Sequence, residues 1–236
     1  MGNGCCILAV DWIGVRSALL SGEPVLIFDS MSREAETDMV YYAGVISYDR
    51  IARLRRDAGG LICYVSGRLF REALELPFLN EALSRHPVYG RLVDKKPRYG
   101  DPPAFNIWVN HVDTYTGISD HDKALTIRRL HEVAENIYKG FMEEAQTIFY
   151  REFYAPGHVP VLTSRGLGSR RGHTELVTAL AVITGLTPSM VIAEMLSEGT
   201  SMAREDAMRY ARRHGLHYID GFDIIVEAEK RGVLND

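Results

Sequence analysis

The chain has 236 residues, of which 46% are hydrophobic and 25% charged, and its formal net charge is -4. This composition suits a globular core, and the slight negative charge excludes the basic footprint of proteins that bind nucleic acid or an anionic membrane surface. No apolar run is long enough to span a bilayer, and the first ten residues lack the basic start and cleavage site of a secretory signal. Cys5, Cys6 and Cys63 predict neither a disulfide framework nor a zinc site, because their number is odd and no CxxC pair is present. We therefore expect a cytoplasmic protein without a nucleic-acid or membrane partner.

Predicted strands and helices alternate along the chain. The expected strands are Val25–Phe28, 39–42, 61–65, 105–113, 158–162, 189–196 and 216–219. The expected helices are 47–59 with Ser47 as N-cap and Gly59 as stop, 119–136 with a capping box of Ser119 and Asp122, 138–153, 173–185, 201–215 closed by Gly215, and a last helix after 219. Residues 83–103 are rich in Pro, Gly, Tyr and Arg and should form a long ordered loop. Mixed strands and helices without a linker predict one α/β domain.

An acidic turn lies between the first two predicted strands. It contains Asp29, Glu34, Glu36 and Asp38, with Arg33 as its basic residue. One interpretation is a solvated turn whose carboxylates face water. The other is a site for a hard cation such as Mg²⁺, since an extended turn would place three of these carboxylates on one side, where their charges need a cation or substrate. The turn alone leaves both interpretations open.

A second polar group begins the predicted helix at 173. The stretch SRRGHTEL (169–176) places two arginines, a glycine, a histidine and a threonine at a helix N-terminus. Free amides, the helix dipole and bidentate arginines favour a phosphate there, although an ordinary basic loop before a helix cap is the alternative.

Three isolated positions are open to a structural or a functional interpretation. His158 follows a Pro-Gly turn, and the YTGIS turn at 115–119 is either a helix cap or an anion site. Glu194 lies inside an apolar strand, where a charge needs a partner or a site.

Taken together, these segments resemble the 3,4-dihydroxy-2-butanone 4-phosphate synthase family of riboflavin biosynthesis, in its stand-alone archaeal-type form. The stretch FDSMSREAETD is similar to the family's acidic loop, DDxDRENEGD. The further matching stretches, in the family's order, are GGLIC, TGIS..D.A.TIR, PGHV, RRGHTEL and AEML..GT.MAR. The resemblance implies one α+β domain over 1–236, with a mixed sheet flanked by helices and without the cyclohydrolase domain to which the family is often fused. It also implies a homodimer with sites near the subunit interface.

The resemblance also implies roles for the matching residues. Glu34 and His173 would hold Mg²⁺ or Mn²⁺, with two ions in each site when substrate is bound. The implied substrate-binding residues are Arg33, Glu34, Asp38, Thr116, Arg170, Arg171, Gly172, His173, Thr174 and Glu194. The implied catalytic residues are His158, Glu194, Glu36, Asp38 and Cys63.

The implied activity is a carbon–carbon lyase reaction, in which D-ribulose 5-phosphate gives L-3,4-dihydroxy-2-butanone 4-phosphate and formate. Such chemistry needs acids and bases that work near neutral pH, and neighbouring carboxylates raise one another's pKa toward that range. We expect Glu36 or Asp38 to act at the C1–C3 end of the sugar, and His158 and Glu194 to act in later proton transfers.

The acidic loop departs from the family pattern at Ser30, Ser32, Ala35 and Thr37, and Arg171 replaces a usual glycine. These changes leave open another metal-dependent sugar-phosphate lyase or isomerase. A non-catalytic sugar-phosphate-binding module is the alternative from a different class. The joint presence of Glu34, His173, His158 and Glu194 favours an enzyme, because a binding module needs no proton-transfer pair.

Overall fold

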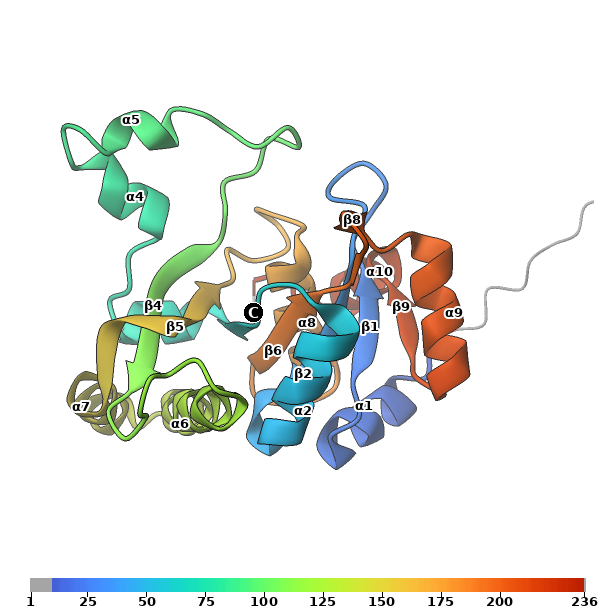
Figure 1. Cartoon of the computed structure of the whole chain (residues 1–236), viewed down its shortest axis with the longest axis horizontal. Helices are drawn as coiled ribbons and strands as arrows, with labels where there is room; N and C mark the ends of the chain where they lie inside the picture. The colour runs from blue at the N-terminus through green and yellow to red at the C-terminus, as the bar shows by residue number, and fades with distance from the viewer. Residues whose placement is uncertain (1–9, 236) are drawn as a thin grey trace, which may run out of the picture.

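A computed structural model of the chain describes residues 10–235, so Cys5 and Cys6 lie outside the described residues. Within 10–235 the strands form one mixed sheet in the order β4-β5-β3-β6-β2-β1-β9 and a small β7-β8 hairpin (Figure 1). Strands β5 and β3 pair in parallel, as do β1 and β9, and the other neighbouring pairs of the large sheet are antiparallel. The strands are β1 (Val25–Phe28), β2 (Thr37–Tyr42), β3 (Cys63–Ser66), β4 (Phe105–His111), β5 (Phe153–Thr163), β6 (Ser189–Glu194), β7 (Leu196–Ser197), β8 (Thr200–Ser201) and β9 (Tyr218–Asp220). The predicted mixed sheet is confirmed.

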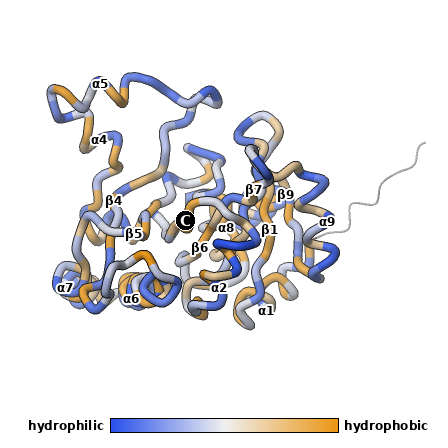
Figure 2. The backbone as a smooth tube through the Cα atoms, in the orientation of Figure 1, coloured by the Kyte–Doolittle hydropathy of each residue, from blue (hydrophilic) through white to orange (hydrophobic). Residues whose placement is uncertain are grey.

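Helices cover both faces of the sheet. The α-helices are α1 (Trp12–Ser21), α2 (Tyr48–Arg53), α3 (Arg68–Ala73), α4 (Leu79–Ser84), α5 (Gly90–Val93), α6 (Asp120–Tyr138), α7 (Met142–Glu152), α8 (His173–Ile183), α9 (Arg204–His214) and α10 (Gly221–Arg231). Side chains of α2, α6, α7 and α9 form one hydrophobic cluster with one face of the sheet, and those of α1, α8 and α10 form another with the opposite face. Because both faces are covered, β1 and β2 are buried along their whole length, and the strands are among the hydrophobic parts of the chain (Figure 2).

The connection from β3 to β4 leaves the body of the molecule. It contains α3, α4 and α5, of which α4 and α5 stand away from the sheet above β4 (Figure 1). The predicted loop at 83–103 is therefore wrong in part, because it contains the last two residues of α4 and all of α5. The short helices α1 and α3 and the β7-β8 hairpin were not predicted.

Other predicted boundaries are corrected by local structure. The helix expected at 138–153 is interrupted at Gly140, whose φ is 91°, and α7 ends where β5 begins at Phe153 rather than at 158. The helix at 47–59 ends in a wider turn, Leu54–Ala58, before Gly59. The capping box is half formed: the hydroxyl of Ser119 accepts the amide of Asp122, but the Asp122 carboxylate accepts the amide of Gly117 instead of that of Ser119.

No helix among residues 10–235 is both long enough and apolar enough to cross a membrane.

Candidate active site

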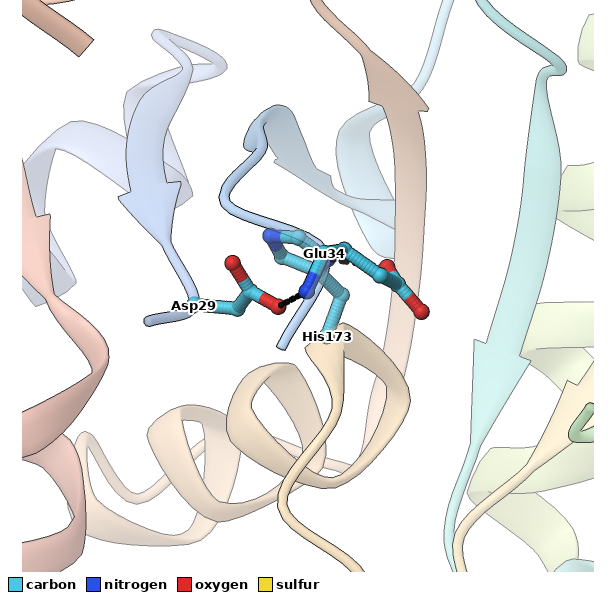
Figure 3. Close-up of side chains that lie close together, drawn as sticks. All are labelled: Asp29, Glu34 and His173. Carbon is cyan, nitrogen blue, oxygen red and sulfur yellow. Dashed lines mark hydrogen bonds and ion pairs between the residues drawn. The ribbon is translucent and has the colours of Figure 1, made fainter. Parts of the chain in front are cut away.

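The acidic turn folds around the carboxylate of Asp29. This buried side chain accepts the amide of Glu34 at 3.0 Å (Figure 3) and the amide of Glu36 at 3.1 Å. The two bonds draw the turn inward, and Ala35 between them adopts the left-handed conformation, with φ 55°. Asp29 therefore fixes the backbone on which the other acidic side chains stand.

The turn meets the first residue of α8. The imidazole of His173 lies 3.4 Å from the Glu34 carboxylate through Nδ1 and 3.7 Å from that of Asp38 through Nε2. Ligand atoms of Asp29, Glu34 and His173 all lie within 4.8 Å of one another. His173 Nε2 and Asp38 Oδ1 are buried and have no hydrogen-bond partner. Carboxylate oxygens with one imidazole suit a divalent cation such as Mg²⁺ or Mn²⁺, so these residues fit a metal site.

Burial and neighbouring charges shift the pKa values of this group. Burial lowers the pKa of His173, but the charges of Asp38, Glu34 and Asp29 outweigh it and raise the value to about 9. Burial raises the pKa of Asp38 to about 8, helped by the charges of Glu194, Glu34 and Glu36 and opposed by that of His173. For Glu34, burial is outweighed by the hydrogen bond and charge of His173 and the charge of Arg33, so that its pKa falls to about 2. The cluster thus contains one group whose pKa lies well below neutral pH, Glu34, and two whose pKa values lie above it, Asp38 and His173.

Strand pairing brings Glu194 to the same place. Asp38 on β2 lies opposite Glu194 on β6, so both side chains project from the face that α8 covers. The Glu194 carboxylate accepts the amide of Leu61 at 2.8 Å. A Cβ on Gly60 would lie 2.3 Å from this carboxylate, so the close approach requires glycine there.

Glu36 and Cys63 lie beside this pair. The Glu36 carboxylate accepts the hydroxyl of Ser201, from β8, at 2.5 Å. Cys63 of β3 is buried and pairs with Ile192 of β6. Its burial, and to a smaller extent the charges of Glu194 and Asp38, raise the pKa of its thiol well above the ordinary value. The thiol is therefore neutral at physiological pH.

Most of these residues line a cavity of about 290 Å³, but Asp29 and Cys63 are not in its lining. Its lining comprises Glu34, Glu36, Asp38, Tyr99, Pro103, Ala104, Phe105, Leu162, Arg170, His173, Thr174, Ile192 and Glu194. The lining thus contains four carboxylates together with Arg170 and the first two residues of α8, His173 and Thr174.

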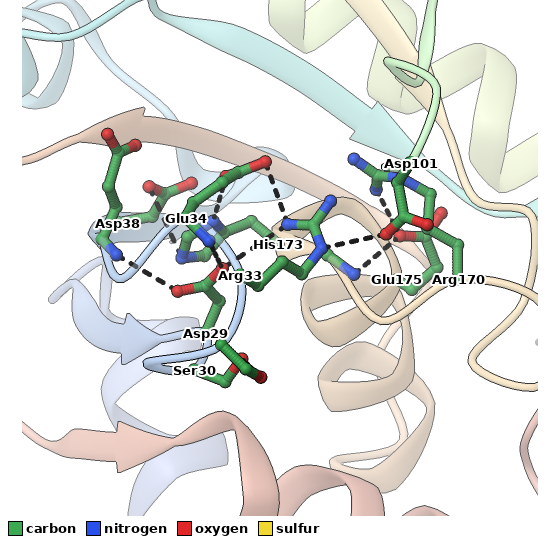
Figure 4. A network of polar contacts seen from close by, with 12 residues as sticks. Asp29, Ser30, Arg33, Glu34, Asp38, Asp101, Arg170, His173 and Glu175 are labelled. Atoms are coloured by element: carbon green, nitrogen blue, oxygen red, sulfur yellow. Dashed lines mark hydrogen bonds and ion pairs between the residues drawn. The ribbon is translucent and has the colours of Figure 1, made fainter. Parts of the chain in front are cut away.

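Glu175, in the first turn of α8, is buried and binds residues of the segment that precedes the helix. Its carboxylate lies 2.5 Å from Arg170 Nη1 and accepts the amides of Gly172 at 3.2 Å and Arg165 at 3.1 Å (Figure 4). A Cβ on Gly172 would lie 2.4 Å from Arg170 Nη1 and 2.8 Å from Arg33 Cζ, so two guanidinium groups approach the backbone there. Arg171 is exposed, pairs with Glu229 at 3.8 Å and lines a neighbouring cavity instead.

The structure places His158 and Thr116 outside this cavity. Both are exposed, and Asn110 joins them: its Oδ1 accepts the amide of His158 at 2.8 Å, and its Nδ2 donates to the carbonyl of Thr116 at 3.4 Å. His158 lies on β5, which is separated from β6 by β3, so about 10 Å of sheet lies between the strands of His158 and Glu194. Within one chain, His158 and Thr116 therefore form a group around Asn110 that is separate from the predicted residues at the cavity.

Several residues of the site were not predicted. Asp29 was named only as part of the acidic turn and Glu175 only within the stretch RRGHTEL, and neither was given a role of its own although each is a carboxylate inside a quoted motif. Tyr99 and Asp101, which contact the acidic turn, come from the 83–103 segment, where no local pattern pointed to the site.

Comparison with known proteins identifies the family. The model of the family described as 3,4-dihydroxy-2-butanone 4-phosphate synthase matches residues 14–227. A 3,4-dihydroxy-2-butanone 4-phosphate synthase of Methanosarcina mazei is 39% identical, over 88% of this chain and 87% of its own. One of Archaeoglobus fulgidus is also 39% identical, over 94% of this chain and 96% of its own. A crystal structure of a 3,4-dihydroxy-2-butanone 4-phosphate synthase in complex with two magnesium ions superposes with a TM-score of 0.72, at 29% identity, and covers 94% of this chain and 97% of that one.

Proposed function

This chain belongs to the 3,4-dihydroxy-2-butanone 4-phosphate synthase family, and we propose that the cavity at the start of α8 binds D-ribulose 5-phosphate. The protein is an enzyme of riboflavin biosynthesis, a carbon–carbon lyase. Its reaction yields L-3,4-dihydroxy-2-butanone 4-phosphate and formate. The two products contain all the atoms of the substrate, so no oxidant, reductant or second substrate is required.

The proposal rests on one observation: Glu34, Asp38, Glu194 and His173 converge on a single cavity that Arg170 and Thr174, at the start of α8, also line. The amides at the start of α8 and the Arg170 guanidinium suit the phosphate group of the sugar. The carboxylates then lie along the polyhydroxy chain. A binding module would need the phosphate end only.

We assign Glu34 and His173 as metal ligands, with Asp29 as the residue that orients Glu34. Asp29 already accepts two amides, whereas His173 Nε2 is buried without a partner. A bound Mg²⁺ or Mn²⁺ would polarise adjacent oxygens of the sugar. The magnesium complex of a related enzyme supports divalent metal use, and two ions in each site is part of the proposal.

Asp38 is the best placed proton carrier. Its carboxyl has a pKa of about 8, so near neutral pH it can both hold and release a proton. Glu194 lies opposite it, and Glu36 enters the same cavity from the turn. We propose that this group of acids serves the successive proton transfers of the reaction.

We further propose a homodimer in which a second copy of the chain brings its His158 and Thr116 to the cavity. Within one chain these two residues are exposed and lie outside it. Large side chains around them are also exposed, among them Tyr115 at 97% and Ile118 at 56%, which suits an interface. Arg170 and Thr174 line the cavity and would hold the phosphate from within the chain, whereas Arg33 lines the neighbouring cavity.

The function is tested by incubating purified protein with D-ribulose 5-phosphate, with and without Mg²⁺, and following formate and the four-carbon phosphate. Stoichiometric formation of both products, dependent on the metal, is expected. Consumption of substrate without formate would contradict the proposed reaction.

The shared site is tested by mixing two inactive variants, His158→Ala and Glu34→Gln. If each site takes His158 from one copy and Glu34 from the other, a random mixture recovers about a quarter of native activity, because half of the dimers are mixed and each has one intact site. Mixing two batches of Glu34→Gln is the control and recovers none. Absence of recovery after subunit exchange would refute the shared site.

A further inference from the structure

The stretch after Glu194 turns back as a hairpin and reaches the acidic turn, and we propose that its Ser201 is a positioning residue for Glu36. This inference rests on the proposed function, because it takes Glu36 as one of the acids that act on the sugar. The hairpin consists of β7 and β8, and Gly199, with φ 74°, lies in the connection between them. It stands beside the turn between β1 and β2 (Figure 1).

Backbone hydrogen bonds fix the place of the hairpin against β2. Met195, which precedes β7, donates its amide to the carbonyl of Thr37 at 2.8 Å, and Met202 closes the hairpin by donating to the carbonyl of Met195 at 2.8 Å. Thr37 follows Glu36 in the chain, and Met202 follows Ser201. The two bonds therefore bring Ser201 next to Glu36.

The Ser201 hydroxyl holds the carboxylate of Glu36. It donates to Oε1 of Glu36 at 2.5 Å, and no other hydrogen bond or ion pair involves this carboxylate among residues 10–235. The Glu36 backbone is held separately, because its amide donates to Asp29 Oδ1 at 3.1 Å and its carbonyl accepts the amide of Asp29 at 3.2 Å. Asp29 thus fixes where the Glu36 side chain begins, and Ser201 fixes where its carboxylate lies.

Ser201 acts on the cavity through Glu36. Glu36 lines the cavity and Ser201 does not, so the serine is outside the space in which the sugar is proposed to bind. Glutamate has several rotatable side-chain bonds, and a carboxylate without a partner would adopt several directions. Glu194, by comparison, is held by the backbone amide of Leu61. The hairpin therefore supplies for Glu36 the restraint that the backbone supplies for Glu194.

The test is Ser201→Ala, which removes the hydroxyl, in assays of formate release from D-ribulose 5-phosphate at saturating Mg²⁺. A displacement of a reacting group by about 1 Å can slow a reaction about 100-fold, and the fixed backbone of Glu36 limits the displacement, so we expect kcat to fall about tenfold. KM for the sugar phosphate and the Mg²⁺ concentration for half-activation should change less than about twofold, because the phosphate and metal residues are untouched. Ser201→Thr keeps the hydroxyl and should restore kcat to within about twofold of the wild type.

The matched control is Ser197→Ala, the same chemical change in the facing strand of the hairpin. Ser197 is exposed, its side chain makes no hydrogen bond with another residue of 10–235, and it does not line the cavity. Its kcat should equal that of the wild type.

Three outcomes would overturn the inference while leaving the proposed function intact. They are equal kcat values for Ser201→Ala and Ser197→Ala, a loss of kcat that Ser201→Thr does not restore, and a rise in KM at unchanged kcat. Absence of formate with the wild-type protein would instead overturn the proposed function, and with it this inference.

Discussion

Substitution of Glu175 by glutamine removes one buried charge without changing the shape of the side chain. Glu175 is 0% exposed and Arg170 is 7% exposed, so the guanidinium loses its anion at a largely buried position. Breaking a buried ion pair on one side typically costs about 3–5 kcal/mol, because the remaining charge is left uncompensated. Glutamine retains one acceptor oxygen, which cannot serve the amides of Gly172 and Arg165 and the guanidinium together.

The measurement is urea unfolding of the purified variant. With a slope of about 2–3 kcal/mol per molar, a loss of this size lowers the midpoint by roughly 1–2.5 M. Inorganic phosphate should stabilise Glu175→Gln more than it stabilises the wild type, because the bound anion replaces the negatively charged partner that Arg170 loses in the variant.

The matched control is Glu72→Gln on α3. Glu72 pairs with Arg68 at 3.6 Å and with Arg71 at 3.4 Å, and the side chains of Glu72 and Arg68 are about half exposed, at 48% and 51%. Exposed pairs contribute about 0.2–1 kcal/mol, so the control should change the midpoint little. If Glu175→Gln unfolded within 1 kcal/mol of the wild type, roughly the control value, the reasoning about the buried pair would be refuted.

Three further predictions concern the turn, the strand pair and the metal. Ala35→Gly should stabilise the protein by about 1 kcal/mol, because glycine adopts the observed positive φ freely, whereas the same change at helical Ala82 should destabilise it by a similar amount in denaturant titrations. Gly60→Ala should reduce kcat strongly, since the new Cβ would displace the Glu194 carboxylate; steady-state rates equal to the wild type would contradict this close contact. Mg²⁺ binding should release protons, and the Mg²⁺ affinity should fall about tenfold for each pH unit below 9, because the metal ligand is the neutral imidazole of His173 and the pKa of this residue is raised to about 9 without metal. Calorimetry in buffers of different ionisation enthalpy measures the proton release. An affinity that does not depend on pH would exclude His173 as a ligand.

Local sequence was sufficient for features that depend on a few neighbouring residues. The run Val25–Phe28 is uniformly apolar and forms β1, and Gly215, with φ 64°, ends α9 as its position after the helical pattern predicted. The breaks at Gly140 and after Arg53 were missed, because a helical pattern of apolar residues continues through both positions. The motif residues of the acidic turn and of the start of α8 were identified as a group, since their order along the chain resembles that of a known family.

Only the tertiary structure decided which of these residues meet. Asp38 faces Glu194 because β2 pairs with β6, and the register of that pairing depends on the packing of both sheet faces rather than on either segment. The ring of Tyr99 lies against Arg33 because a long excursion returns to the acidic turn, and a contact between distant segments leaves no periodic signal in the sequence. His158 matches the motif as well as His173 does, yet the strand order places it away from the cavity of its own chain. The sequence thus determined the chemical groups of the site, and the order of strands in the sheet determined which of them one chain brings together.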